Sequence, residues 1–205
     1  MRSGAGRMMA ATGAAVAAAM LMTACGPSSG DGEPTETPTA TGIEAVYPTE
    51  LEDPGTDLLD RERWGSELAG AEASWQFPEG YEPEDIAPPT QATLTADGAE
   101  FQITIDGDSG SAEAVEGFIE ESIAAVEDAG GEAARTEVRM GGRDYVVLLQ
   151  DMPHDAQSVR TFFLVDDASQ TTFVVSLFAP RQLLDVPQER VEEFHQTVAS
   201  LEVAG

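Results

Sequence analysis

The chain has 205 residues, with 38 acidic residues against 10 arginines and no lysine, and its formal net charge is −28. Such an excess of negative charge argues against a nucleic-acid-binding protein, whose binding surface is basic, and against electrostatic adsorption to an anionic bilayer. Cys25 is the only cysteine, which excludes an intramolecular disulfide, so any folded domain has to be stable without one.

The first residues have the pattern of a bacterial export signal. Arg2 and Arg7 form a short positive region, and residues 8–22 are uncharged and rich in Ala and Met. This apolar run is shorter than the roughly 20 residues that a membrane-spanning helix needs, and it has the length of a signal peptide. We therefore expect residues 1–24 to direct export and to be removed.

The signal runs into Leu21-Met22-Thr23-Ala24-Cys25-Gly26, which resembles the lipobox of bacterial lipoproteins. The resemblance implies cleavage between Ala24 and Cys25 and attachment of diacylglycerol, with acyl chains such as palmitate, to the Cys25 thiol. Met22 stands where the family usually has leucine. We expect a protein that is lipid-anchored on the extracytoplasmic side of the cell membrane, and plain secretion is the alternative. The Ala- and Gly-rich, lysine-free composition is typical of an actinobacterial protein.

Composition divides the rest of the chain into three parts. Residues 25–45 are rich in Pro, Thr, Ser, Gly and Glu, which predicts a disordered tether because few apolar groups are available for burial. Residues 46–71 read as a semi-ordered lead-in, with a short helix capped by Thr56 that carries Leu58, Leu59 and Trp64. Residues 72–205 have the size of one globular domain.

The first half of this domain predicts three strands and a helix. The strands are expected at 75–77, 92–95 and 101–105, and a hairpin turn over 96–98 joins the last two. A helix is expected over 111–129, because Ser111 is a good cap and Gly130-Gly131 a stop signal. Its apolar positions follow one stripe of period 3.6: Val115, Phe118, Ile119, Ile123 and Val126.

The second half predicts four strands, at 135–140, 144–150, 161–166 and 171–178, and a final helix over 187–201. On that helix one apolar face is formed by Val191, Phe194, Val198 and Leu201.

The strands at 144–150 and 161–166 are apolar on both faces, so both sides of their sheet need cover. The connections between the four strands are too short for crossovers, which predicts antiparallel pairing. We expect an α+β fold, an α/β/α sandwich in which the two helices cover a central antiparallel sheet.

This layout resembles the PsbP-like fold of the photosystem protein PsbP and of envelope lipoproteins of the LpqN and DcrB type. The matching features are Phe77-Pro78-Glu79-Gly80-Tyr81 after the first strand, Gly141-Gly142-Arg143 before a hairpin strand, and Phe194 with Ser200-Leu201 in the last helix. The resemblance covers roughly residues 75–203. It implies a binding or assembly role at the envelope without catalysis, and it supplies no catalytic residues.

A rival hypothesis is an envelope hydrolase. Residues 107–111 read Gly-Asp-Ser-Gly-Ser, which resembles the nucleophile motif of trypsin-like proteases and of Gly-Asp-Ser esterases. An esterase would use Ser109 with Glu192 and His195, but the asparagine that completes its oxyanion hole cannot exist in a chain without asparagine. We expect a polar loop that leads to the Ser111 cap.

No metal or cofactor site is predicted. Asp106 and Asp108 begin like a calcium-binding EF-hand loop, but Gly110, Ser111 and Gly117 occupy positions at which that loop needs other residues. His154 is expected in a turn and His195 on a helix surface.

The last candidate is the acidic side of the helix at 111–129. It could bind a cationic envelope protein or another ligand, or it could be only a solvated face of an acidic protein. A passive structural lipoprotein is the corresponding third hypothesis for the whole chain. The candidate surface consists of Glu113, Glu116, Glu120, Glu121, Glu127 and Asp128. The aromatic residues expected in the core are Trp75, Tyr81, Phe118 and Phe194.

Overall fold

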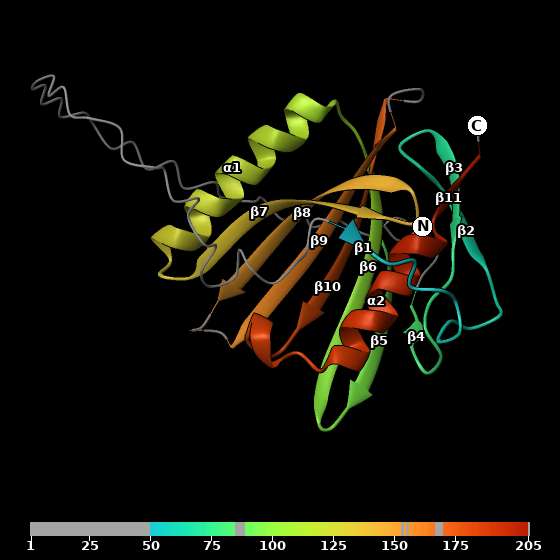
Figure 1. Cartoon of the computed structure of the whole chain (residues 1–205), viewed down its shortest axis with the longest axis horizontal. Helices are drawn as coiled ribbons and strands as arrows, with labels where there is room; N and C mark the ends of the chain where they lie inside the picture. Colours follow the sequence, from blue (N-terminus) through green and yellow to red (C-terminus); the bar gives the residue numbers. More distant parts are fainter. Residues whose placement is uncertain (1–49, 85–88, 153, 155, 167–169, 205) are drawn as a thin grey trace, which may run out of the picture. The chain divides into compact units, whose positions relative to one another are not determined.

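The computed structural model describes residues 50–84, 89–152, 154, 156–166 and 170–204 (Figure 1). The predicted signal peptide, the Cys25 lipid site and the tether lie outside the described residues. The strands are β1 (Glu50–Leu51), β2 (Trp64–Leu68), β3 (Ala71–Trp75), β4 (Glu82–Pro83), β5 (Thr90–Ala96), β6 (Ala99–Ser109), β7 (Glu132–Met140), β8 (Arg143–Met152), β9 (Gln157–Asp166), β10 (Thr171–Ala179) and β11 (Glu202–Val203). The helices are α1 (Ala112–Asp128) and α2 (Gln188–Ser200), with a 3₁₀ turn, η2 (Leu183–Asp185).

Eight strands form the main sheet, in the order β1-β7-β8-β9-β10-β6-β5-β4. Among the described pairs of this sheet, β1 with β7 is the parallel one and the others are antiparallel. Tight turns explain this pairing. Asp97 and Gly98 between β5 and β6, and Gly141 and Gly142 between β7 and β8, all have positive φ, as two-residue hairpin turns require. The predicted antiparallel sheet is confirmed.

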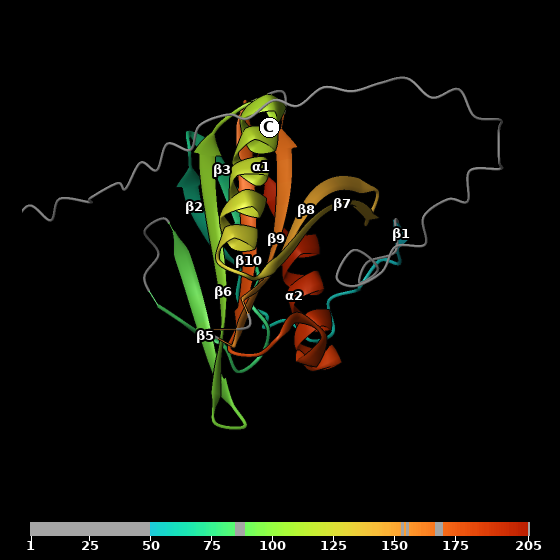
Figure 2. The same cartoon turned by 90° about the vertical axis from the view of Figure 1, so that its left-hand side faces the viewer.

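Side chains of the central strands alternate between two apolar clusters. On β8, Tyr145 and Val147 join the larger cluster, which contains Phe194 of α2, whereas Leu148 joins Val115 of α1 in the smaller one. The two helices therefore cover opposite faces of the sheet, as Figures 1 and 2 show. A mixed α+β fold with a large sheet and two helices is confirmed.

The face that α2 covers also carries a second, three-stranded sheet, in the order β11-β3-β2. The short helix predicted around Thr56 is wrong, because Trp64–Leu68 is a strand that pairs with β3. Leu68 is fully buried, and Leu59 is 5% exposed. The folded part of the chain therefore begins well before residue 72, and β3 ends at Trp75 where a strand was predicted to begin.

Helix ends follow the sequence signals. Ser111 caps α1 by accepting the backbone N–H of Ala114 at 3.4 Å, and Gly130, with a φ of +79°, ends it. The predicted apolar face of α2 is confirmed, since its residues Val191, Phe194, Val198 and Leu201 are buried. Residues 107–109 belong to β6, so the prediction that a loop begins at Gly107 is wrong.

Candidate functional site

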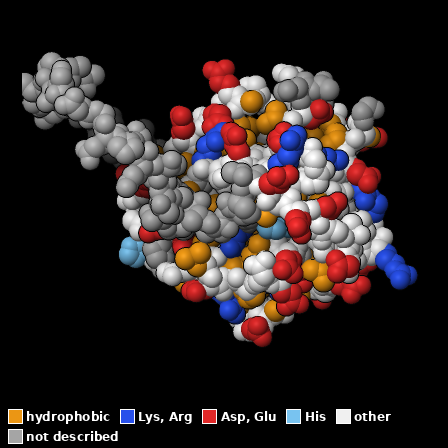
Figure 3. Space-filling view, in the orientation of Figure 1, with side chains coloured by type: hydrophobic (Ala, Val, Ile, Leu, Met, Phe, Trp, Pro, Cys, Tyr) orange, Lys and Arg blue, Asp and Glu red, His pale blue; other side chains and the backbone are white. Residues whose placement is uncertain are grey.

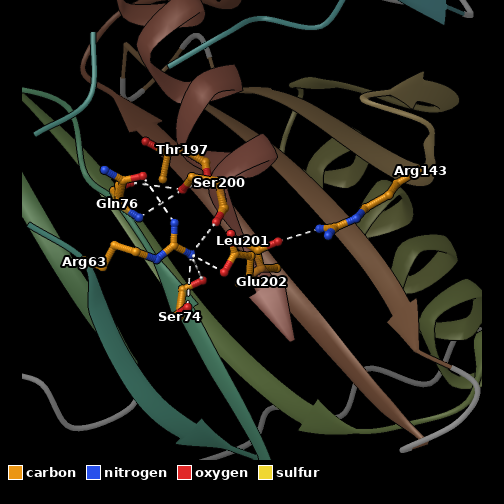
Figure 4. Close-up of polar contacts among 8 residues, drawn as sticks. All are labelled: Arg63, Ser74, Gln76, Arg143, Thr197, Ser200, Leu201 and Glu202. Atoms are coloured by element: carbon orange, nitrogen blue, oxygen red, sulfur yellow. Dashed lines mark hydrogen bonds and ion pairs between the residues drawn. The ribbon is translucent and has the colours of Figure 1, made fainter. Parts of the chain in front are cut away.

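A cluster of polar contacts surrounds Arg63, which precedes β2 (Figure 4). The Arg63 guanidinium donates to Ser74 Oγ at 3.0 Å and to the Ser200 carbonyl at 3.0 Å. It also donates to Gln76 Oε1 at 3.2 Å and pairs with Glu202 at 3.2 Å. This Arg63 cluster joins the small sheet to the end of α2.

Hydrogen bonds from the same cluster are made to the backbone carbonyls at the C-terminal end of α2. Ser200 Oγ donates to the Thr197 carbonyl at 2.7 Å and accepts the Gln76 backbone N–H at 2.9 Å. Arg143 donates to the Leu201 carbonyl (Figure 4). Cationic donors stabilise the partly negative carbonyls at a helix C-terminus. The groups drawn here bond to one another, so the cluster has a structural role.

A second polar group lies inside the fold. Arg190 and the buried Glu193 form an ion pair of 2.7 Å beside Tyr81. Burial raises the pKa of Glu193 above its ordinary value, and burial, with the charge of Glu193, also raises the pKa of Tyr81. A carboxylate held by its own i,i+3 arginine is a structural feature.

His195 is the residue that the hydrolase hypothesis needs as a base. It is 9% exposed, and its ring centroid lies 5.7 Å from that of Phe162 and 6.2 Å from that of Phe194. The expected surface position is wrong, because α2 is covered on more than one side and buries most of its circumference. Burial lowers the pKa of His195 to about 4. Glu192, its partner in that hypothesis, is exposed.

The glycine of the Gly-Asp-Ser motif has a packing explanation. Gly107 lies on β6 where Leu68 of β2 rests on the main sheet, and a Cβ at position 107 would lie 2.6 Å from the Leu68 Cβ. Only glycine allows this approach. The described part of the motif is strand backbone, in which Ser109 pairs with Thr171.

The residues considered as metal ligands in the sequence do not lie together. Asp106 accepts the backbone N–H of Gly107 at 2.8 Å, and His154 is exposed in the turn that follows β8. Within the described residues, no group of three or more His, Cys, Asp and Glu side chains could hold a metal ion. In that same part of the chain, neither helix is long and apolar enough to cross a membrane.

The acidic residues of α1 do not form one surface. Glu116 pairs with Arg135 of β7 at 2.6 Å, and the hydrogen bond from Arg135 lowers the pKa of that carboxyl. At 3.6 residues per turn, Glu120 and Glu127 lie on the same flank of the helix as Glu116. The exposed members are Glu113, Glu120, Glu121, Glu127 and Asp128.

The opposite flank of α1 is apolar and carries an exposed aromatic ring. Phe118 is 56% exposed, although the sequence predicts it in the core. Its ring packs edge-to-face on Phe163, with centroids 6.0 Å apart. The centre of the buried stripe runs through Val115, Ile119 and Val126, so Phe118 points sideways from the helix.

A cavity of about 160 Å³ lies against Phe118, between α1 and the ends of β6, β9 and β10. A second cavity, of about 330 Å³, lies along the C-terminal half of the same flank. We call this flank and its two cavities the α1 groove. The first cavity is lined by Asp108, Gly110, Ala114, Val115, Phe118, Phe163, Thr172 and Val174. The second is lined by Ser122, Ala125, Val126, Ala129, Gly131, Gln150, Met152 and His154.

The rim of the α1 groove is acidic. Asp108 lines it on the sheet side, and Glu121 and Asp128 lie about 60–80° around the helix from Phe118. On the face seen in Figure 3, acidic side chains are widely spread, with several arginines among them. The sequence signal for this groove was a row of small residues on one flank of α1. The side chains of Ala114, Ala125 and Ala129 are too short to cover the sheet beside them.

Comparison with known proteins assigns no family. No family model matches the chain, and no curated protein matches it. Among solved structures, the chain is similar to the Ran-binding protein Mog1p of Saccharomyces cerevisiae, with a TM-score of 0.44 and 14% identity over 69% of this chain and 95% of that one. A mutant of Mog1 gives a TM-score of 0.41 and 15% identity over the same shares. Likeness at this level identifies neither a family nor a function for this chain.

Proposed function

We propose that this protein is a non-enzymatic binding protein of the cell envelope, held to the membrane by lipid on Cys25 and carrying a PsbP-like domain on a tether. The observation that supports a binding role best is Phe118, a large apolar side chain that is 56% exposed beside an apolar cavity. Together with the apolar lining of the α1 groove, Phe118 forms a continuous apolar surface, and such exposed surfaces mark interaction sites. The lipobox-like residues support the anchor.

The partner is a protein segment with apolar side chains on one face and basic side chains at its edges. The floor of the α1 groove is built from Val115, Phe163 and Val174, which suits an apolar face. Its rim includes Asp108, and none of the described residues that line the cavity at Phe118 is basic. Complementary charge steers such a partner to the groove and sets its orientation.

Photocrosslinking in intact envelopes tests the binding role. A p-benzoylphenylalanine side chain at position 118 should capture a discrete partner. The same side chain at position 124, which is exposed on the outer face of α1, should capture much less. Equal capture from both positions would contradict a binding role for the α1 groove.

A pair of charge variants tests the partner's chemistry. Glu121→Gln with Asp128→Asn removes charge near Phe118 and should lower capture from position 118. Glu120→Gln with Glu127→Gln removes the same charge from the opposite flank and should leave capture unchanged. A similar loss in both variants would show that only the total charge matters.

The anchor has its own test. Cys25→Ser should abolish labelling by a radioactive fatty acid and release the protein from membranes. Labelling equal to that of the unsubstituted protein would contradict the lipid anchor. The crosslinking test of the binding role does not depend on this outcome.

A further inference from the structure

Neither helix of the described residues covers the whole of the main sheet on the side of α1. That helix lies over the β7–β9 part of the sheet, and Figure 2 shows it in front of the upper part of the sheet while the lower parts of β5 and β6 are clear of it. On this side the side chains of β5, β6 and β10 are mostly polar. The described residues of this open area include Gln91, Thr93, Gln102, Thr104 and Phe178.

Three of these side chains lie next to one another across three strands. Thr93 of β5 is the pairing partner of Gln102 of β6, and Gln102 is the pairing partner of Phe178 of β10. Directly paired residues have Cβ atoms about 4.5–5.5 Å apart on one face of the sheet. Phe178 is 41% exposed, so this row presents an aromatic ring beside an amide and a hydroxyl. We call the row the Phe178 platform.

A chain of hydrogen bonds orients the Gln102 amide of the platform. Gln102 Nε2 donates to Gln91 Oε1 at 2.9 Å, and Gln91 Nε2 donates to a carboxylate oxygen of Glu84. The Glu84 backbone N–H also donates to the Gln91 carbonyl at 2.8 Å. Gln102 on β6 and Glu84, which directly follows β4, are therefore held at set positions, which lowers the entropy lost when they bind a ligand.

The platform borders a cavity of about 320 Å³, whose rim carries Glu84 and Glu100. This volume is in the range of small-molecule sites. The cavity is lined by Glu84, Thr93, Glu100, Gln102, Gln157, Ser158, Phe178, Ala179 and Pro180.

We infer that the Phe178 platform binds a neutral saccharide. The face of an aromatic ring is the negative part of its quadrupole, and it attracts the polarised C–H bonds of a sugar ring. Sugar hydroxyls both donate and accept hydrogen bonds. Gln102 offers an amide donor and acceptor, Thr93 a hydroxyl, and the carboxylates of Glu84 and Glu100 accept.

The charge of the protein selects among saccharides. Glu84 and Glu100 at the rim, on a chain with a net charge of −28, repel anionic sugars such as uronic acids. A peptide would instead need an apolar anchor pocket, whereas the three-strand row offers one flat ring among polar groups. The platform is separate from the α1 groove and does not depend on it.

The test is ligand-observed saturation-transfer NMR with the purified chain and three neutral disaccharides: maltose, cellobiose and N,N′-diacetylchitobiose. At least one should receive saturation, and glucuronic acid should receive none. Phe178→Ala should weaken the binding about five- to tenfold, as expected for the loss of an aromatic contact. Gln102→Ala should weaken it as well.

Two variants serve as controls. Phe118→Ala removes an exposed aromatic ring of the α1 groove and should leave saccharide binding unchanged. Phe178→Tyr keeps an aromatic ring and should retain binding even if Phe178→Ala folds poorly. No saturation of any of the three disaccharides would overturn the inference. Binding that survives both Phe178→Ala and Gln102→Ala, or that is lost equally in Phe118→Ala, would overturn it too.

Discussion

His195 shows how strongly tertiary burial changes one residue. Its position between Glu192 and Gln196 in an amphipathic pattern suggests a surface residue, yet it packs on Phe162 and Phe194. No local signal distinguishes the two cases, because the small sheet that helps to cover α2 comes from β2 and β3, more than a hundred residues earlier in the chain.

This burial predicts a dependence of stability on pH. Folded His195 takes up its proton only near pH 4, whereas an unfolded histidine does so near pH 6.5. Between these values the unfolded state binds more protons, so stability falls as the pH is lowered through this window. The free energy of unfolding, measured in urea, should fall between about pH 7 and about pH 5, and in His195→Gln this fall should be smaller by about 2 kcal/mol.

Glu193 acts in the opposite direction, because its pKa is raised by burial. At a pH above the ordinary pKa of a glutamate, Glu193 binds a proton more readily in the folded state than in the unfolded state. Glu193 therefore stabilises the folded state as the pH falls. The comparison between the original chain and His195→Gln cancels this contribution. An unchanged pH profile in that variant would mean that His195 is not buried as described.

Substitution by alanine should have opposite effects on stability at Gly107 and at Gly117. A Cβ at position 107 would lie 2.6 Å from the Leu68 Cβ, whereas a Cβ at position 117 would meet nothing within 4 Å. Gly107→Ala should destabilise the domain by about 1–3 kcal/mol through overpacking. Gly117→Ala lies within α1 and should stabilise it by about 0.5–1 kcal/mol. Melting temperatures of the two variants should move in opposite directions, and a shift in the same direction would contradict the packing of β2 on β6.

Among the elements, the six long strands of the main sheet, β5 to β10, could be predicted, whereas its short edge strands β1 and β4 and the small sheet could not. Residues 145–149 and 162–165 are apolar in a continuous run, so local pattern and tertiary position agree. Trp64–Leu68 is short and rich in Gly, Ser and Glu. It is a strand because it pairs with β3 through the turn at Ala69 and Gly70, both of which have positive φ.

The place of β2 in the fold predicts the result of truncation. A chain that begins at residue 50 should unfold cooperatively in urea, whereas one that begins at residue 72 loses Leu59 and Leu68 from the core. Removing one buried leucine side chain costs about 2–5 kcal/mol, and the strand pairing of β2 is lost as well. The shorter chain should therefore show no cooperative transition. If both chains melt alike, β2 does not contribute to the stability of the domain.

At the scale of the whole molecule, charge is the dominant feature. Residues 72–205 alone carry 27 acidic residues and 6 arginines, so the folded state repels itself. Added salt screens this repulsion, with a Debye length of about 10 Å at 0.1 M. The melting temperature should rise as sodium chloride increases from about 0.01 M to about 0.3 M. Potassium chloride at equal ionic strength should give the same rise, and a fall in both salts would contradict net self-repulsion.

The antiparallel pairing, the two helices, the Ser111 cap of α1 and the apolar face of α2 could be read from the chain, because each depends on periodicity, turn residues or capping within a few positions. Which residues the helices leave uncovered depends on long-range packing. Phe118 belongs to the apolar stripe of α1, and Phe178 belongs to an apolar strand, yet both are exposed. Their exposure depends on where α1 lies across the sheet, which is a balance of contacts among segments far apart in the chain.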